Sequence, residues 1–295
     1  MREDGAMYFP GTQTEVSYPH GVTAEAASVI AVSELEHGRF AILTDRTPFH
    51  PIDPRWPDQG PDQGIIVAEG LPFEVLDCVI GATDGADLFI GKDIPVRRGT
   101  AGWVFVVAHI LDEPLVVGSS VDMVCDAERR HGLSAGHTAC HVAALALNRV
   151  LTPRWNKEIP VDGLGSPDFD QEALDTSRIG INSAVDVYRL GKSLRKKGFN
   201  ADDLYPELLT LAAEANDLLA SWVEAAAPVT LEIEGPGVTD KRMWVCELPQ
   251  GTQRIPCGGT HLGSLGQYEK IEISFSYDEP IGKLTMRTAA TVLVA

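Results

Sequence analysis

Two short segments of this chain hold residue types that bind transition metals. They are HTACH at 137–141 and CGGTH at 257–261, and in each the first and last residues are four positions apart. On a helix, residues four apart lie on one face. Zinc binds imidazole nitrogen and thiolate sulfur in a tetrahedron. The sequence therefore predicts one zinc ion (Zn2+) bound by His137, His141, Cys257 and His261.

The second segment places two glycines between its candidate ligands, which is typical of a tight turn. The segments are 257 − 141 = 116 positions apart, so only the tertiary fold could bring them together. A zinc finger is excluded, because its cysteine pair precedes its histidine pair by about a dozen residues. The HExxH motif of metalloproteases is excluded because Thr138 stands where its glutamate would be. Cys140 could in principle replace Cys257, although a buried small side chain is the more common role of such a cysteine.

The bulk composition is that of a globular protein. With 295 residues, of which 44% are hydrophobic, the chain can form one large core or two ordinary ones. Its apolar runs are strand-length and fall short of the roughly 20 residues that a membrane helix needs. The start, MREDGAMYFPG, is polar where a secretory signal would be apolar. Five scattered cysteines favour a reducing compartment. We expect a cytoplasmic protein without membrane contact.

The formal net charge of −18 argues against a general affinity for nucleic acid, because proteins that bind phosphates normally present a basic face. One stretch, 188–197, differs from this average in carrying five cations and no anion. Such a patch could direct a polyanion to one place, and a solvated helix end explains it equally well. The candidate RNA contacts are Arg189, Lys192, Arg195, Lys196 and Lys197.

The chain is predicted to be α+β with two domains. Residues 1–124 alternate short apolar runs with Gly, Pro and Asp, which is typical of an all-β barrel or sandwich, and we predict an N-terminal β-barrel-like domain there. Residues 125–295 predict a mixed α/β metal-binding domain. Within it, periodicity predicts helices at 128–151, which carries HTACH, and at 203–226. Strands are expected at 229–233, 243–248, 271–277 and 288–294.

Several segments in this order resemble the alanyl-tRNA editing proteins, freestanding relatives of the editing domain of alanyl-tRNA synthetase. They are DAERR at 126–130 before HTACH, PCGGTHLGSLGQYEKIEI at 256–273, LTDRTPFHP at 43–51, and EAND at 214–217 with Pro228-Val229. The metal-binding half is also similar to the editing domain of threonyl-tRNA synthetase. The chain departs from the family in three places. His50 replaces the usual tyrosine, the paired glycines before Gln59 are absent, and the segment 154–200 is longer.

This resemblance implies an editing domain that hydrolyses the ester joining a wrongly attached serine or glycine to the 3′ end of the alanine tRNA. Thr47 would lie near the amino-acid side chain, where its hydroxyl could bind serine. Gln59 would support the pocket. From the residues alone, Thr47 is equally well a turn residue before Pro48, and Gln59 a solvated loop amide.

Two other functions fit the same residues. One is a zinc-dependent hydrolase of this fold that acts on a small aminoacyl or amide substrate, which the acidic composition favours. The other is a non-catalytic zinc-binding module, because a zinc ion with four protein ligands is usually structural. The sequence carries no pattern that fixes the oligomeric state.

Overall fold

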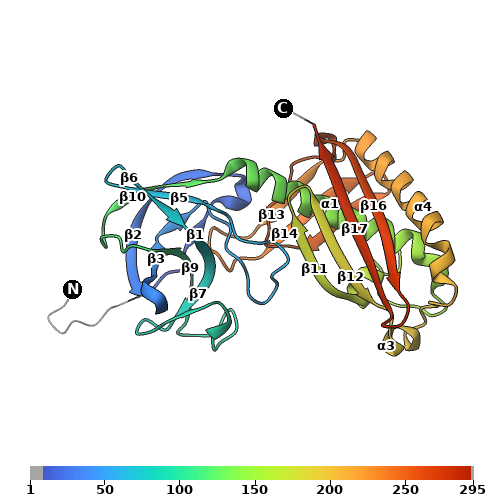
Figure 1. Cartoon of the computed structure of the whole chain (residues 1–295), viewed down its shortest axis with the longest axis horizontal. Helices are drawn as coiled ribbons and strands as arrows, with labels where there is room; N and C mark the ends of the chain where they lie inside the picture. Colours follow the sequence, from blue (N-terminus) through green and yellow to red (C-terminus); the bar gives the residue numbers. More distant parts are fainter. Residues whose placement is uncertain (1–8, 294–295) are drawn as a thin grey trace. The chain divides into compact units, whose positions relative to one another are not determined.

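The computed structural model describes residues 9–293, which fold into two compact units (Figure 1). Unit 1 comprises the residues up to 130 together with 233–241, and unit 2 comprises 131–232 and the residues from 242 onward. The proposed domains at 1–124 and 125–295 remain a prediction about which segments fold independently. Among the described residues, no helix combines the length and the apolar character that crossing a lipid bilayer requires.

Unit 1 is built from β-strands. Its elements are β1 (Glu15–Val16), η1 (Tyr18–His20), β2 (Ala24–Glu34), η2 (Glu36–Gly38), β3 (Phe40–Thr44), β4 (Arg46–Thr47), β5 (Gly64–Ala68), β6 (Leu71–Val75), β7 (Asp77–Thr83), β8 (Leu88–Ile90), η3 (Gly91–Asp93), β9 (Val104–Leu111) and β10 (Ser120–Cys125). Burial alternates strictly along β10, as expected of a strand with one face on the core.

The strands of unit 1 form one eight-stranded sheet in the order β6-β5-β10-β2-β3-β9-β7-β8, with a separate short pair β1-β4. The prediction of a strand-rich N-terminal part is confirmed, and the prediction of a closed barrel is wrong. β6 and β8 are the two ends of the order and do not pair with each other within residues 9–293. β8 has only three residues, all of them matched to β7, so it offers little edge with which to close the sheet.

Unit 2 combines helices with two antiparallel sheets. Its elements are α1 (Ala127–Leu151, which begins in unit 1), η4 (Thr152–Arg154), α2 (Phe169–Ala173), β11 (Leu174–Gly180), β12 (Ser183–Arg189), α3 (Lys192–Lys196), α4 (Leu204–Glu224), β13 (Val229–Ile233), β14 (Arg242–Leu248), β15 (Gly251–Pro256), η5 (Leu265–Gln267), β16 (Tyr268–Asp278) and β17 (Lys283–Val292). The sheets have the orders β11-β12-β17-β16 and β13-β14-β15. Both long predicted helices and all four predicted strands are present, with ends shifted by a few residues.

Helix α4 lies along the sheet that ends in β16 (Figure 1). The Asn216 side chain on α4 donates to the Ile273 carbonyl at 3.1 Å and accepts from the Ile273 N–H at 2.7 Å. Both backbone groups belong to an edge strand, where they would otherwise be open to pairing with another chain. Asn216 therefore both docks α4 and protects the sheet edge.

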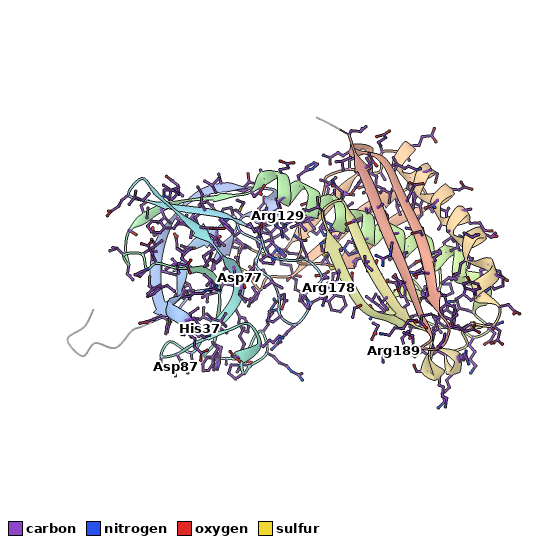
Figure 2. All side chains as sticks on the ribbon, in the orientation of Figure 1. His37, Asp77, Asp87, Arg129, Arg178 and Arg189 are labelled. Carbon is purple, nitrogen blue, oxygen red and sulfur yellow. The ribbon has the colours of Figure 1, made fainter. Side chains whose placement is uncertain are left out.

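Helix α1 starts at a defined cap. The Asp126 carboxylate accepts the backbone N–H of Arg129, which is labelled in Figure 2, at 2.9 Å. The next residue, Arg130, is buried. Its Nε donates to Asp62 at 2.9 Å and its Nη2 donates to the Pro48 carbonyl at 2.6 Å. The buried Arg130–Asp62 pair thus joins the first turn of α1 to the loop between β4 and β5.

Within unit 2, α1 is buried on all sides, since every residue from 132 to 148 except His141 is shielded from solvent. The helix passes very close to the hairpin formed by β11 and β12. A Cβ atom built on Gly136 would lie 2.3 Å from the Gly180 carbonyl oxygen and 2.6 Å from that of Ser183. Only glycine permits this backbone approach.

We predict that Gly136→Ala lowers the free energy of unfolding, because the added methyl group meets backbone atoms that cannot rotate away. Gly132→Ala is the matched control. Its Cβ would meet only the side chain of Ile181, which is 48% exposed and can move. Both changes gain the same helix propensity, so urea denaturation should show Gly136→Ala less stable than Gly132→Ala by about 2 kcal/mol. Equal midpoints would show that the helix and the hairpin are not tightly packed.

Candidate metal centre

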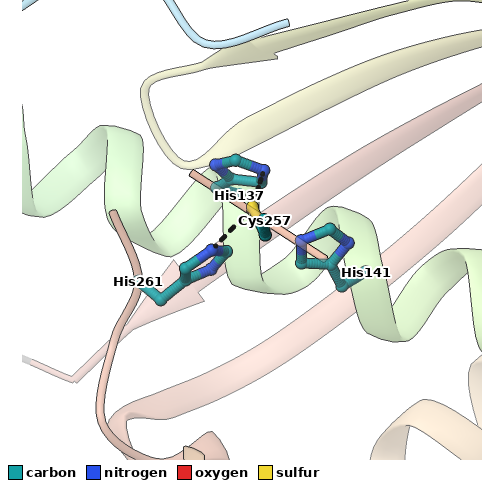
Figure 3. Close-up of side chains that lie close together, drawn as sticks. All are labelled: His137, His141, Cys257 and His261. Carbon is teal, nitrogen blue, oxygen red and sulfur yellow. Dashed lines mark hydrogen bonds between the residues drawn. The ribbon is translucent and has the colours of Figure 1, made fainter. Parts of the chain in front are cut away.

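The four predicted metal ligands converge in unit 2 (Figure 3). One ligand atom from each of His137, His141, Cys257 and His261 can be chosen so that all four lie within 4.8 Å of one another. The Cys257 Sγ lies 3.4 Å from the His137 Nε2 and 3.2 Å from the His261 Nε2. The fold therefore closes the 116-residue gap between the two segments.

These distances fit a bound metal ion. Zn–S and Zn–N bonds of about 2.3 and 2.1 Å at the tetrahedral angle place sulfur and nitrogen about 3.6 Å apart. The two measured separations are only slightly shorter. The imidazole centroids are 4.4 to 5.2 Å apart, so the three rings surround a common point. One thiolate with three imidazoles is a donor set that suits zinc.

Local structure explains how each ligand is positioned. His137 and His141 are one helical turn apart on α1 and project from the same face. Cys257 immediately follows β15, and its N–H donates to the Arg242 carbonyl at 3.1 Å, which fixes the turn to the neighbouring β14. His137 is buried, while the other three candidate ligands are partly exposed.

Two hydroxyl residues on α1 attach the helix to the CGGTH segment. The Ser134 hydroxyl donates to the Thr260 hydroxyl at 2.8 Å. The Thr138 oxygen lies 3.2 Å from the His261 Nδ1 and accepts the Leu262 N–H at 3.1 Å. A ligand histidine usually has its second nitrogen hydrogen-bonded, which sets the orientation of the ring. Thr138 therefore holds His261 with its Nε2 toward Cys257.

Sequence reasoning missed this role of Thr138. From the sequence alone, Thr138 only excludes a metalloprotease motif, because its partner lies 123 positions away. The one available signal is that Ser134 and Thr138 are four apart and adjoin the histidine pair, which places them on a neighbouring strip of the helix.

Trp244 on β14 forms a wall of the cluster. Its side chain is fully buried, with ring centroids 4.9 Å from His141 and 6.1 Å from His261. Trp244 was not predicted, because a buried tryptophan on a strand is common. An apolar wall of this kind lowers the local dielectric and strengthens electrostatic interactions beside it.

Cys140 lies outside the cluster. Its Sγ is 3.4 Å from an Asp186 carboxylate oxygen and 3.9 Å from the Ser177 hydroxyl. Burial and the nearby Asp186 carboxylate raise the pKa of the Cys140 thiol well above its ordinary value, so it remains protonated. Cys257, and not Cys140, is therefore the thiol placed to bind metal.

We predict that the purified chain binds about one zinc ion and that Cys257→Ala abolishes this binding. Cys140→Ala is the matched control and should keep the metal, because its sulfur faces Asp186. Thr138→Val should weaken zinc binding about tenfold by releasing His261. Metal analysis and titration with Co²⁺, whose thiolate absorption reports a Cys ligand, measure all three. Unchanged zinc content in Cys257→Ala would contradict the assignment.

The two predicted catalytic residues, Thr47 and Gln59, lie in unit 1. Both side chains are buried, with exposed fractions of 0% and 1%. The Thr47 hydroxyl is 2.9 Å from the His109 Nε2 and accepts the Phe49 N–H at 3.1 Å. The Gln59 backbone N–H donates to the Asp58 side chain at 2.7 Å. The structure thus gives Thr47 partners within the protein, and a role of either residue toward a substrate stays a prediction.

The hydrogen bonds around His109 determine its tautomer. Its Nδ1 lies 3.1 Å from the Ile42 carbonyl oxygen, which can only accept, so Nδ1 carries the proton. Its Nε2 must then accept the hydroxyl proton of Thr47. Burial lowers the pKa of His109 to about 4, so the ring is neutral near pH 7. His109 therefore fixes the orientation of the Thr47 hydroxyl.

We predict a loss of stability on acidification that depends on His109. In the unfolded chain histidine has a pKa of about 6.5, while the folded value is about 4. The stabilisation is therefore complete above pH 6.5 and is lost as the pH falls to about 4, by roughly 3 kcal/mol. His109→Gln, which keeps a neutral donor and acceptor, should remove this dependence in urea denaturation. His20→Gln, at an exposed position, is the control, and parallel curves for all three proteins would contradict the prediction.

The predicted basic patch is partly neutralised. Arg189, labelled in Figure 2, forms an ion pair with Asp175, and Lys197 forms one with Glu172. Lys192, Arg195 and Lys196 belong to the short helix α3. The anionic partners lie 14 and 25 positions before the cations they pair with. The stretch 188–197 contains no anion in sequence, but in the fold anionic side chains lie beside two of its cations. Contact of these five residues with RNA stays a prediction.

In sequence, the chain is similar to part of one enzyme, alanine–tRNA ligase, in several bacteria. It is 27% identical over 95% of its length to the alanine–tRNA ligase of Cutibacterium acnes, and 28% identical over 99% of its length to that of Kocuria rhizophila. It is 29% identical over 51% of its length to that of Haemophilus influenzae. The alignments cover 27%, 28% and 15% of these relatives, so the chain spans about a quarter of their length or less. No family model matches the chain. The resemblance to the synthetase is confirmed.

Proposed function

We propose that this chain is a zinc-dependent trans-editing hydrolase that removes serine or glycine from mischarged alanine tRNA. The observation that carries the proposal is the His137, His141, Cys257 and His261 cluster, in a chain that aligns over 95% of its length with part of an alanine–tRNA ligase. The editing domain of that synthetase, which the motifs resemble, hydrolyses such esters.

The cluster has the chemistry that ester hydrolysis needs. The reaction develops negative charge on the carbonyl oxygen of the ester. A zinc ion held by the four ligands would supply a positive charge for that oxygen and lower the pKa of a nearby water. Thr138 orients His261, and Trp244 shields one side of the cluster from bulk water.

Four protein ligands complete a tetrahedron, and such closed sites are usually structural. We therefore propose that the substrate approaches from the side on which His141, Cys257 and His261 are partly exposed, where a fifth ligand could be accepted. We propose that Thr47 and Gln59 influence the choice of amino acid. The resemblance supports this role for Thr47, whose buried hydroxyl donates to His109. We also propose a cytoplasmic location, where charged tRNA is found.

The test is deacylation of alanine tRNA charged with serine, glycine or alanine. We predict release of serine or glycine, little release of alanine, and a loss of at least about 100-fold in rate for His137→Ala. Cys140→Ala, the control already matched for metal content, should retain activity. Thr47→Val should reduce the preference for serine over alanine while leaving the zinc content unchanged.

A second function is favoured by one observation. The net charge of −18 and the ion pairs of Arg189 and Lys197 reduce the positive charge of the 188–197 stretch, in which Lys192, Arg195 and Lys196 are exposed. A zinc hydrolase acting on a small aminoacyl or amide substrate would suit such a surface. Its activity would be indifferent to added salt and independent of tRNA. Turnover of serine esters without tRNA, at an unchanged rate from 50 to 300 mM salt, would replace the first proposal with the second.

A further inference from the structure

Unit 1 contains a cavity that the proposed reaction does not use. Its volume is about 220 Å³. Lys92 on η3, Ile80 on β7 and Phe105 on β9 line it, together with Asp53, Arg55 and Arg98 from the adjoining loops. The metal cluster belongs to unit 2, so the cavity is a different site.

The backbone positions the loop that carries Asp53 and Arg55. Ile52 pairs in parallel with Val79 of β7, and the Ile80 N–H donates to the Ile52 carbonyl at 3.3 Å. The residues that directly follow Ile52 are therefore held at the side of β7, next to the cavity. This attachment ties the start of the loop to the sheet.

The cavity is cationic in a chain that is strongly anionic. Three cations and one carboxylate line it, which leaves a formal charge of 3 − 1 = +2. The Asp53 carboxylate accepts the Arg98 guanidinium at 2.7 Å and the Arg55 backbone N–H at 3.0 Å. Asp53 therefore holds the loop and one arginine in place. Within residues 9–293, Lys92 takes part in no ion pair, and its side chain is exposed.

The arginines keep donors for a ligand. A guanidinium has five N–H groups in a planar fork that matches phosphate oxygens. Arg98 Nη2 donates to Asp53, and Arg55 Nη2 donates to the Val96 carbonyl. Each guanidinium thus uses one of its two terminal nitrogens for the loop. With Lys92, the remaining N–H groups can bind an anion that presents several oxygens.

The floor of the cavity is apolar. Ile80 and Phe105 are 3% and 5% exposed, and both belong to the core of unit 1. Gly91 also lines the cavity. A cationic rim over an apolar floor suits a phosphate that is attached to a larger organic group better than inorganic phosphate alone.

We propose that this cavity binds the phosphate group of an organic phosphate ester through Arg55, Lys92 and Arg98. The ester has two possible sources, a free nucleotide and the backbone of the tRNA substrate, and the second source rests on the proposed function.

The direct test is calorimetric titration of the full chain with adenosine 5′-monophosphate and with inorganic phosphate. We expect the nucleotide to bind more tightly than phosphate. Lys92→Glu should weaken both by at least about tenfold, because it removes one attraction and adds one repulsion. Lys241→Glu is the matched control, since Lys241 is also exposed in unit 1 but lies outside the cavity. The affinity of this variant for the two phosphate compounds should change less than twofold. Lys92→Ala should lose less affinity than Lys92→Glu but more than the control. This result would show that the loss does not depend on the introduced carboxylate.

Binding of uncharged alanine tRNA distinguishes the two sources. If the ligand is a tRNA phosphate, Lys92→Glu weakens tRNA binding, lowers the dependence of log K on log salt by about one, and the nucleotide competes with tRNA. If the ligand is a free nucleotide, Lys92→Glu weakens nucleotide binding alone. Both results support the site.

The proposal is overturned if neither phosphate compound binds, or if Lys92→Glu and Lys241→Glu bind them as the unchanged chain does. The failure of the site and that of the proposed function are separable. If the chain deacylates Ser-tRNA but its cavity binds no phosphate compound, only the proposed phosphate site is ruled out. If nucleotide binding depends on Lys92 but the chain deacylates no tRNA, only the proposed editing function is ruled out.

Discussion

The metal cluster depends on the close placement of α1 against two other segments of unit 2. On one side the Gly136 backbone approaches the β11–β12 hairpin without an intervening side chain. On the other, Ser134 hydrogen-bonds to Thr260 of the CGGTH segment and Thr138 to Leu262, which follows it. Because His137 lies between these positions, an outward shift of the helix would separate it from Cys257. The core packing and the ligand geometry are therefore set by the same contacts.

The sequence was sufficient for the features that depend on short-range patterns. The spacing of four within HTACH predicts two histidines on one helix face, and this is observed. The glycines of CGGTH predict a tight turn, whereas the segment has only a bend at Gly259 and neither glycine has a positive φ. Periodicity likewise predicts α1, from the spacing of four between Leu133, His137, His141 and Leu145, and α4, whose apolar residues recur at intervals of three and four. These signals are local, and tertiary packing reinforced them.

Features that depend on distant partners were not predictable. Thr138 acquires its role from His261, and the cations of 188–197 lose part of their charge to Asp175 and Glu172. No periodicity links such positions. The expectation of a closed barrel was wrong for a similar reason. Alternating apolar runs predict strands, but whether the first and last strands of a sheet pair depends on their lengths and register, as the three-residue β8 illustrates.

The five cysteines of this chain differ in their exposure to solvent and therefore in their expected reactivity. Cys78, Cys125, Cys140 and Cys246 are buried, and burial raises the pKa of each above its ordinary value, which suppresses the nucleophilic thiolate. Cys257 alone is partly exposed. An alkylating reagent added to the folded protein should therefore modify one sulfur first. A coordinated ion would protect that sulfur, so the labelling rate reads out occupancy directly.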